Sequence, residues 1–196
     1  MQTVLDTIRA ELVAHPSNAW ARELGWQPLY AAAPGARVVV VGQAPGRKAQ
    51  ASGIPWDDAS GVRLRAWLGV PDEVFYDPER FAILPMDFWY PGKGTSGDLP
   101  PRPDFAPLWH PRILAELPDV RLLVLVGAYA QKYYLGARAR GTLTETVRAW
   151  AEYLPDAVPL VHPSPLNFRW QTRNPWFEQE VVPALRARVA EALGEG

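Results

Sequence analysis

Arg37-Val-Val-Val-Val-Gly-Gln-Ala-Pro-Gly46 is the stretch from which the fold class follows. Four consecutive valines favour a β-strand, because β-branched side chains pack well on a pleated surface. An uninterrupted apolar run is typical of a strand buried on both faces of a parallel sheet. The glycines and the proline after it end the strand, and their small size would let a ligand approach the backbone. A tight structural turn is the alternative interpretation of this loop.

Three more apolar runs, at residues 81–85, 121–127 and 158–161, are predicted to be strands. Apolar residues at helical spacing predict a first helix that begins at Val4 and stops near His15, and further helices over residues 60–68, 107–117, 128–135, 143–153 and 176–192. Strands that alternate with helices predict a three-layer α/β/α fold with a short, mostly parallel sheet of four strands. We expect residues 1–196 to form a single domain.

Composition limits the possible functions. The net charge is −1 at pH 7, so any binding to a polyanion such as DNA has to come from a local patch of cations. No cysteine is present, which excludes disulfides, a thiolate nucleophile and thiolate-held metal centres. Residues 1–15 lack a basic-then-apolar leader, and no apolar run approaches the roughly 20 residues of a membrane span. We therefore expect a cytoplasmic protein that contacts no membrane.

Residues 86–107 hold too many prolines and glycines for a helix or a central strand. A linker is one interpretation. Loops of this length in compact domains are usually functional or disordered, and Phe88, Trp89, Tyr90 and Phe105 would give this one apolar anchors. We expect an ordered loop at the active site.

The loop after the last predicted strand is His162-Pro-Ser-Pro-Leu-Asn167. Two prolines stiffen it, and it carries an imidazole, a hydroxyl and an apolar side chain. A leucine on a rigid polar loop could wedge into a DNA duplex and fill the space left by an extruded nucleotide. The alternatives are a structural histidine bonded to backbone and a leucine that packs in the core.

Three motifs in order along the chain carry a family resemblance: Gly42-Gln-Ala-Pro-Gly46, Gly127-Ala-Tyr-Ala-Gln-Lys132 and His162-Pro-Ser-Pro-Leu-Asn167. Together they resemble the uracil-DNA glycosylase superfamily. The last two are similar to the classical enzymes, which carry Gly-Ser-Tyr-Ala-Gln-Lys and His-Pro-Ser-Pro-Leu-Ser. The first is closer to Gly-Glu-Ala-Pro-Gly of the thermostable bacterial and archaeal branch, whose Gly-x-Pro-Phe segment resembles residues 53–56. The resemblance spans residues 37–170 and implies a uracil-DNA glycosylase-like fold that acts on a base flipped out of DNA.

The same resemblance implies roles for individual residues. His162 would donate a hydrogen bond to O2 of the leaving base, Trp56 would stack on that base, and Leu166 would be the wedge. Ser164 and Asn167, with the amides of their loop, would hold the DNA phosphates. The base pocket would further be lined by Gly42, Gln43, Ala44, Pro45, Gly46, Pro85 and Met86.

Two positions depart from the family pattern. Where the family places Asp, Asn or Glu to activate water, this chain has Gln43 and Ala44, neither of which is a general base. Gln43 can only orient a water. Where the family reads uracil with an asparagine, this chain has Pro85, so Met86, Asp87 or a backbone amide would have to substitute.

Asp57 and Asp58 follow Trp56 and are candidates for the missing base. The alternative is that they cap the helix predicted from residue 60, since aspartate favours that position. An Asn substitution of a catalytic aspartate should abolish turnover while DNA binding survives.

Cations beside the motifs are candidates for binding the DNA backbone: Arg47, Lys48, Lys93, Arg102, Lys132, Arg169 and Arg173. The sequence predicts a monomeric glycosylase without metal or cofactor that removes a deaminated base from DNA, with uracil as the favoured base. Two alternatives remain open, namely a glycosylase for hypoxanthine or xanthine and a non-catalytic binder of damaged or single-stranded DNA.

Overall fold

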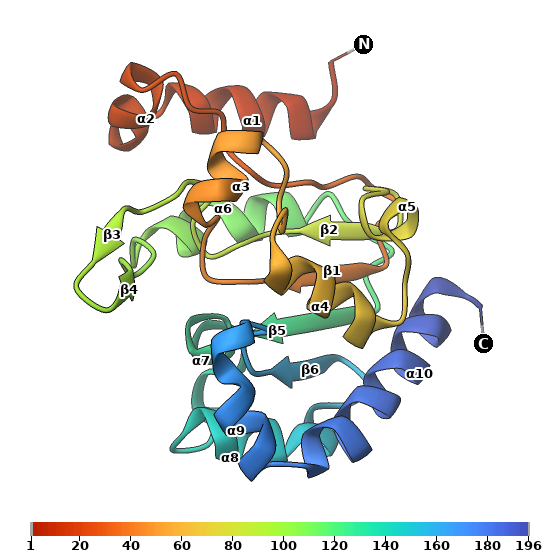
Figure 1. Ribbon diagram of the computed structural model, residues 1–196. Coiled ribbons are helices and arrows are strands. Elements are labelled where there is room, and N and C mark those ends of the chain that lie inside the picture. Colours follow the sequence, from red (N-terminus) through yellow and green to blue (C-terminus); the bar gives the residue numbers. More distant parts are fainter. Residues whose placement is uncertain (1, 196) are drawn as a thin grey trace.

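The computed structural model describes residues 2–195, which form a four-stranded parallel sheet between two layers of helices (Figure 1). The strands are β1 (Val38–Val41), β2 (Phe81–Ile83), β5 (Leu122–Val126) and β6 (Ala157–Leu160), in the order β2-β1-β5-β6. In the register of the sheet, Val39 lies between Ala82 and Leu123. The predicted three-layer α/β fold is confirmed, and the four predicted strands lie within one or two residues of their expected positions.

Ten α-helices accompany the strands within the described residues: α1 (Val4–Ala14), α2 (Ala19–Glu23), α3 (Arg47–Ser52), α4 (Ala59–Leu68), α5 (Asp72–Phe75), α6 (Phe105–Leu114), α7 (Ala128–Leu135), α8 (Leu143–Arg148), α9 (Phe168–Arg173) and α10 (Val182–Leu193). Six of them correspond to the expected helices, with three shifts, whereas α2, α3, α5 and α9 were not predicted. Helix α6 runs two to three residues earlier than predicted. After α8 the chain passes into a 3₁₀ turn, and a π-helical turn, Phe177–Val181, precedes α10.

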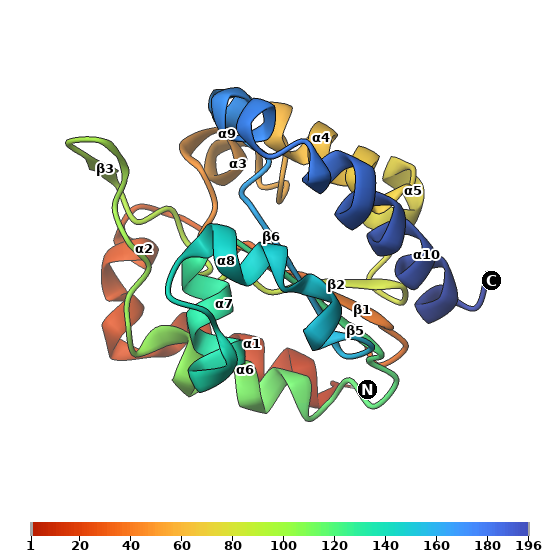
Figure 2. The ribbon, with the colours of Figure 1, turned by 90° about the horizontal axis from the view of Figure 1, so that it is seen from below.

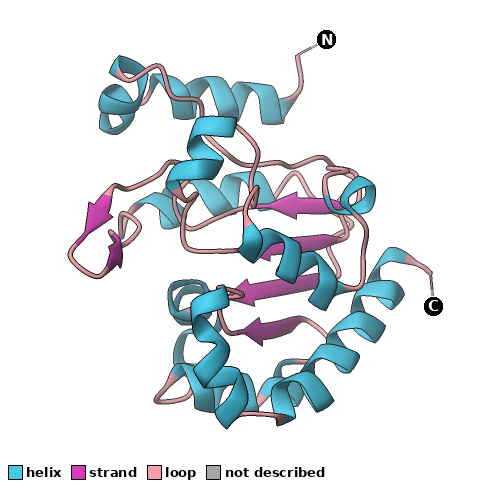
Figure 3. Cartoon of the chain, viewed as in Figure 1, coloured by secondary structure: helices cyan, strands magenta, loops and turns pink. Residues whose placement is uncertain are grey.

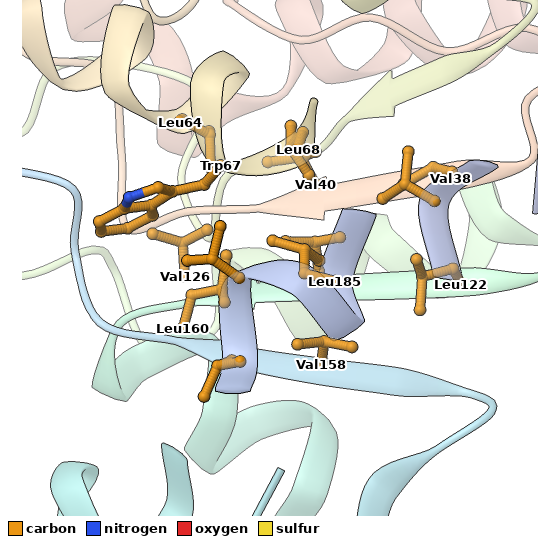
Figure 4. Close-up of a cluster of buried hydrophobic side chains, with 14 of the residues drawn as sticks. Val38, Val40, Leu64, Trp67, Leu68, Leu122, Val126, Val158, Leu160 and Leu185 are labelled. Atoms are coloured by element: carbon orange, nitrogen blue, oxygen red, sulfur yellow. The ribbon is translucent and has the colours of Figure 1, made fainter. Parts of the chain in front are cut away.

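The valines of β1 pack alternately against the two helix layers, which Figure 2 shows on opposite faces of the sheet. Val38 and Val40 contact a cluster that includes α4 and α10 (Figure 4), whereas Val39 and Val41 join a cluster with α1 and α6. All four side chains are fully buried. Burying each of these side chains stabilises the fold by roughly 1.5–3 kcal/mol. The strand therefore lies at the centre of the core, with apolar packing on both of its faces.

Residues 86–104 form an ordered loop and not a linker, and residues 105–107 begin α6. Phe88 and Trp89 are buried in the core, and a short hairpin of β3 (Lys93–Gly94) and β4 (Gly97–Asp98) follows them. Figure 3 shows that this hairpin lies on the side toward which the strands of the sheet point. The loop therefore stands beside the carboxyl ends of the strands, where parallel sheets bind ligands.

Arg102 fastens this loop to the core. Its guanidinium forms a forked ion pair with Asp87, Nε lying 2.6 Å and Nη2 2.9 Å from the two carboxyl oxygens, and Nη1 donates to Asn18 at 2.7 Å. Asp87 is 2% exposed. Arg102 therefore has a structural role, because its guanidinium compensates a buried carboxylate, and its contact with the DNA backbone stays a prediction.

Candidate active site

A cavity of about 440 Å³ opens at the carboxyl ends of β1, β2 and β6. The loop after β1, the turn before α4, the β3–β4 hairpin and the loop after β6 all contribute to its wall. The lining residues are Leu29, Gly42, Gln43, Ala44, Pro45, Gly46, Ala49, Pro55, Trp56, Asp58, Ile83, Pro85, Pro91, Lys93, Ser96, Gly97, Asp98, His162, Ser164 and Leu166. The structure thus brings together most of the residues that the sequence singled out, from four separate segments.

The loop that follows β1 is bonded to the end of β2. The backbone N–H of Met86 donates to the Gly42 carbonyl at 2.9 Å, and that of Asp87 donates to the Gln43 carbonyl at 3.2 Å. Gly42 also lies against the indole of Trp56, so that a Cβ added to it would be 2.8 Å from Cζ2. Only glycine leaves room for the indole at this point.

Trp56 has a left-handed backbone, with φ of 57°, and it is the one non-glycine residue with positive φ among those described. Such a conformation costs a side-chain-bearing residue on the order of 1–3 kcal/mol and persists only where surrounding contacts enforce it. Those contacts are visible: Arg65 and Tyr76 donate to the carbonyls of Trp56 and Pro55 at 3.4 and 3.0 Å, and a Cβ on Gly61 would collide with the Trp56 carbonyl. The indole is held as a wall of the cavity.

His162 lies next to this wall. Its ring centroid is 5.8 Å from that of Trp56, with the two planes tilted by 32°. Its backbone carbonyl accepts a hydrogen bond from the side chain of Asn167 at 2.8 Å, which closes the loop on itself. Burial lowers the pKa of His162 below its ordinary value, while the charge of Asp58 acts in the opposite direction. His162 is therefore a neutral imidazole at pH 7, with one N–H to donate.

The two aspartates beside Trp56 have different surroundings. Asp58 caps α4, accepting from the Gly61 N–H at 2.8 Å, and also lines the cavity. Asp57 does not line it, and its carboxylate faces Lys48 at 3.9 Å. Asp58 can thus cap the helix and face the cavity at the same time, because the cap uses only one of its two carboxyl oxygens.

Gln43 and Ala44 both lie on the cavity wall. The side-chain amide of Gln43 donates to the Leu99 carbonyl at 3.1 Å, a contact that joins the β1 loop to the loop of residues 86–107. This hydrogen bond fixes how the amide is turned toward the cavity.

The end of β2 offers the cavity little for reading a base. Pro85 lines it but has no N–H, and its carbonyl accepts from Nε2 of the buried His110 at 3.0 Å. Met86 is buried in the core, 7% exposed, and Asp87 is paired with Arg102. The backbone amides of both residues already donate to the β1 loop. The expected substitutes for the missing asparagine are therefore engaged elsewhere.

The loop after β6 presents its leucine to solvent. Leu166 is 87% exposed, which rules out the alternative that it packs in the core. Ser164 caps the 3₁₀ turn Pro165–Asn167 by accepting from the Leu166 N–H at 3.2 Å. Asn167 points inward to the His162 carbonyl. The loop is thus braced from within while its apolar tip projects at the rim of the cavity.

The remaining candidate cations lie on the surface of the described chain. Lys48 follows the β1 loop, Lys93 lies on the hairpin beside Asp98 at 4.0 Å, and Lys132 is on α7. Arg169 and Arg173 lie on α9, and Arg47 begins α3. All six are exposed.

Several residues of the site escaped the sequence analysis. Leu29 and Ile83 line the cavity without any motif to mark them, and Arg65 is recognisable only from its contacts. Ser96, Gly97 and Asp98 lie in the segment expected to form an active-site loop, and its glycines are the signal for the hairpin that carries them.

Residues 2–195 contain no group of three His, Asp or Glu side chains arranged to hold a metal ion. Among the described helices, none has the length and apolar character needed to cross a membrane. One comparison with known proteins gives a family match: the model of the uracil DNA glycosylase superfamily covers residues 29–186.

Proposed function

The chain belongs to the uracil DNA glycosylase superfamily, and we propose that it hydrolyses the N-glycosidic bond of a deaminated base flipped out of DNA. Uracil is the favoured base. DNA glycosylase chemistry is the activity of this family. The observation that supports it most strongly here is the convergence of Trp56, the Gly42–Gly46 loop and His162 on one cavity, with Leu166 at its rim. A flipped base would enter the cavity while the leucine takes its place in the DNA.

Trp56 and His162 supply the binding and the charge stabilisation in this proposal. The base stacks against the indole, whose position is fixed before any ligand arrives. As the glycosidic bond breaks, negative charge develops on the base, and the N–H of the neutral His162 donates to its carbonyl oxygen. A preorganised donor of this kind is worth about 3 kcal/mol of transition-state stabilisation.

Asp58 is the candidate that accepts a proton from the attacking water. It is the aspartate that lines the cavity next to Trp56. The helix cap uses one of its two carboxyl oxygens, which leaves the other for the proton of the water. Gln43 would orient the same water through its fixed amide. Asp58 would thus take over the role of the Asp, Asn or Glu that the family carries in the β1 loop.

We predict that Asp58→Asn lowers the excision rate about 10²–10⁴-fold, the usual contribution of a general base. Asparagine caps helices as well as aspartate does, so α4 should remain folded. The matched control is Asp57→Asn, which removes a charge one residue away without changing the cavity wall. Single-turnover excision and DNA affinity are measured for both variants; an Asp58→Asn enzyme as fast as wild type would refute the role.

A second candidate function is excision of hypoxanthine or xanthine. It is favoured by the end of β2, where the Pro85 carbonyl and the amides of Met86 and Asp87 are already bonded within the protein. Without a fixed amide to select the uracil edge, the cavity would admit other deaminated bases.

Oligonucleotides that carry uracil, hypoxanthine or xanthine, treated with enzyme and then with alkali, decide between these functions. Strand breakage at uracil alone supports the first, and breakage at the purines supports the second. Binding to all three without any breakage would identify a non-catalytic member of the fold.

A further inference from the structure

A second, smaller cavity of about 250 Å³ adjoins the first. It is lined by Gln43, Val126, Gly127, Ala128, Tyr129, Leu143, Val161, His162, Asn167 and Trp170, and we call it the side pocket. Gln43 and His162 line both cavities, and the loop after β6 contributes to both. The side pocket is therefore within reach of a nucleotide that adjoins one bound in the main cavity.

The chemistry of the side pocket suits an uncharged aromatic ring. No lysine, arginine, aspartate or glutamate is among its lining residues, so a phosphate placed inside would lack a charged partner. Apart from Gln43, His162 and Asn167, its side chains are aliphatic or aromatic. Its volume is below the roughly 300–1,000 Å³ of pockets for drug-sized ligands, which fits one heterocyclic base without its sugar.

Two aromatic side chains form the side pocket's stacking surfaces. Tyr129, in the first turn of α7, is 44% exposed, so part of its ring is open to a ligand. Trp170 on α9 is fixed by a hydrogen bond from its indole N–H to Thr144 at 2.8 Å and packs edge-on against Phe177. Aromatic rings placed in this way are the platforms on which single-stranded nucleic acids stack.

We propose that the side pocket binds the base next to the flipped nucleotide on the same strand. This inference rests on the proposed function of the main cavity. In a duplex the neighbouring base is paired and stacked, so moving it into the pocket adds an unstacking cost to that of the flipped base. In a single strand most of that cost is absent.

The test is an equilibrium binding measurement on short single strands that carry 2′-fluoro-2′-deoxyuridine, whose glycosidic bond resists hydrolysis. Tyr129→Ala should weaken binding about tenfold, the size expected for losing one base–aromatic stack. Tyr129→Phe, which keeps the ring, should bind like wild type. Leu108→Ala, an exposed apolar residue on α6 away from both cavities, is the control.

The decisive step repeats these measurements with an abasic nucleotide on the 5′ or the 3′ side of the fluorinated uridine. The effect of Tyr129→Ala should disappear for one of the two strands, which identifies the bound neighbour. An equal loss of affinity with and without the neighbouring base, or no loss at all, overturns the proposal. Trp170→Leu should show the same dependence on the neighbour.

Because the probe is not cleaved, the result does not depend on catalysis. Neighbour-dependent binding of the probe, together with failure to release a base from strands that carry uracil, hypoxanthine or xanthine, would contradict the proposed glycosylase function and leave the side pocket assignment standing. Base release together with neighbour-independent binding would do the reverse.

Discussion

At the scale of single residues, the site depends on how Trp56 is held. Its backbone has a positive φ, and Gly42 opposite its ring and Gly61 behind its carbonyl leave the space that this conformation needs. The sequence shows the tryptophan beside two aspartates, but a left-handed backbone at a tryptophan cannot be inferred from its neighbours, because the residue type itself disfavours it.

Gly42→Ala tests this arrangement. The new Cβ would lie 2.8 Å from Trp56 Cζ2, so the indole has to move away from the β1 loop. We predict at least a tenfold loss of affinity for a DNA strand with a flipped base, and a free energy of unfolding changed by less than about 1 kcal/mol because the ring is at the cavity surface.

Gly46→Ala in the same loop is the comparison, since its Cβ would meet no atom within 4 Å. It should lose far less affinity than Gly42→Ala. Equal losses in the two variants would show that the loop tolerates no side chain for reasons unrelated to Trp56.

At the scale of elements, the strands were predictable and the segment of residues 86–107 was predictable only in part. Each strand is a continuous apolar run, a signal that survives in the sequence because both faces of the sheet are buried. Helices α2, α3, α5 and α9 were missed because each is only one to two turns long and too short to show an apolar repeat. The structural role of Arg102 could not be predicted from the sequence because its partners, Asp87 and Asn18, lie 15 and 84 residues away in the chain.

Arg102→Met is predicted to destabilise the fold by about 3–5 kcal/mol, the usual cost of leaving a buried carboxylate unpaired. The measurement is the free energy of unfolding from denaturant titration. Arg112→Met is the matched control, because Arg112 pairs with Glu11 where both side chains are exposed. That pair should contribute about 0–1 kcal/mol. Similar losses in the two variants would contradict the structural role given to Arg102.

At the scale of the whole molecule, a buried histidine makes stability depend on pH. His110 is fully buried between the Pro85 carbonyl and the Tyr134 hydroxyl, and burial lowers its pKa from 6.5 to about 4. Between these two values the unfolded chain binds a proton that the folded chain does not, so stability falls as the pH is lowered. His162, whose pKa is also lowered, contributes in the same direction.

We predict that the lowered pKa of His110 decreases the free energy of unfolding by up to about 3 kcal/mol between pH 6.5 and pH 4. His110→Gln, which does not titrate, should be less stable at neutral pH but should lose less on acidification than wild type. Parallel pH profiles for the two proteins would show that His110 is not responsible.

The proposed function requires His162 to act on a base inside the main cavity, and release of free uracil from a uracil-containing strand tests it most directly. Under single-turnover conditions wild type should release uracil, and His162→Leu should do so about 10²–10³-fold more slowly, the usual effect of removing one donor to developing charge. DNA affinity should change little. Equal rates for the two proteins, or bound DNA from which wild type releases no uracil, would contradict the proposed function.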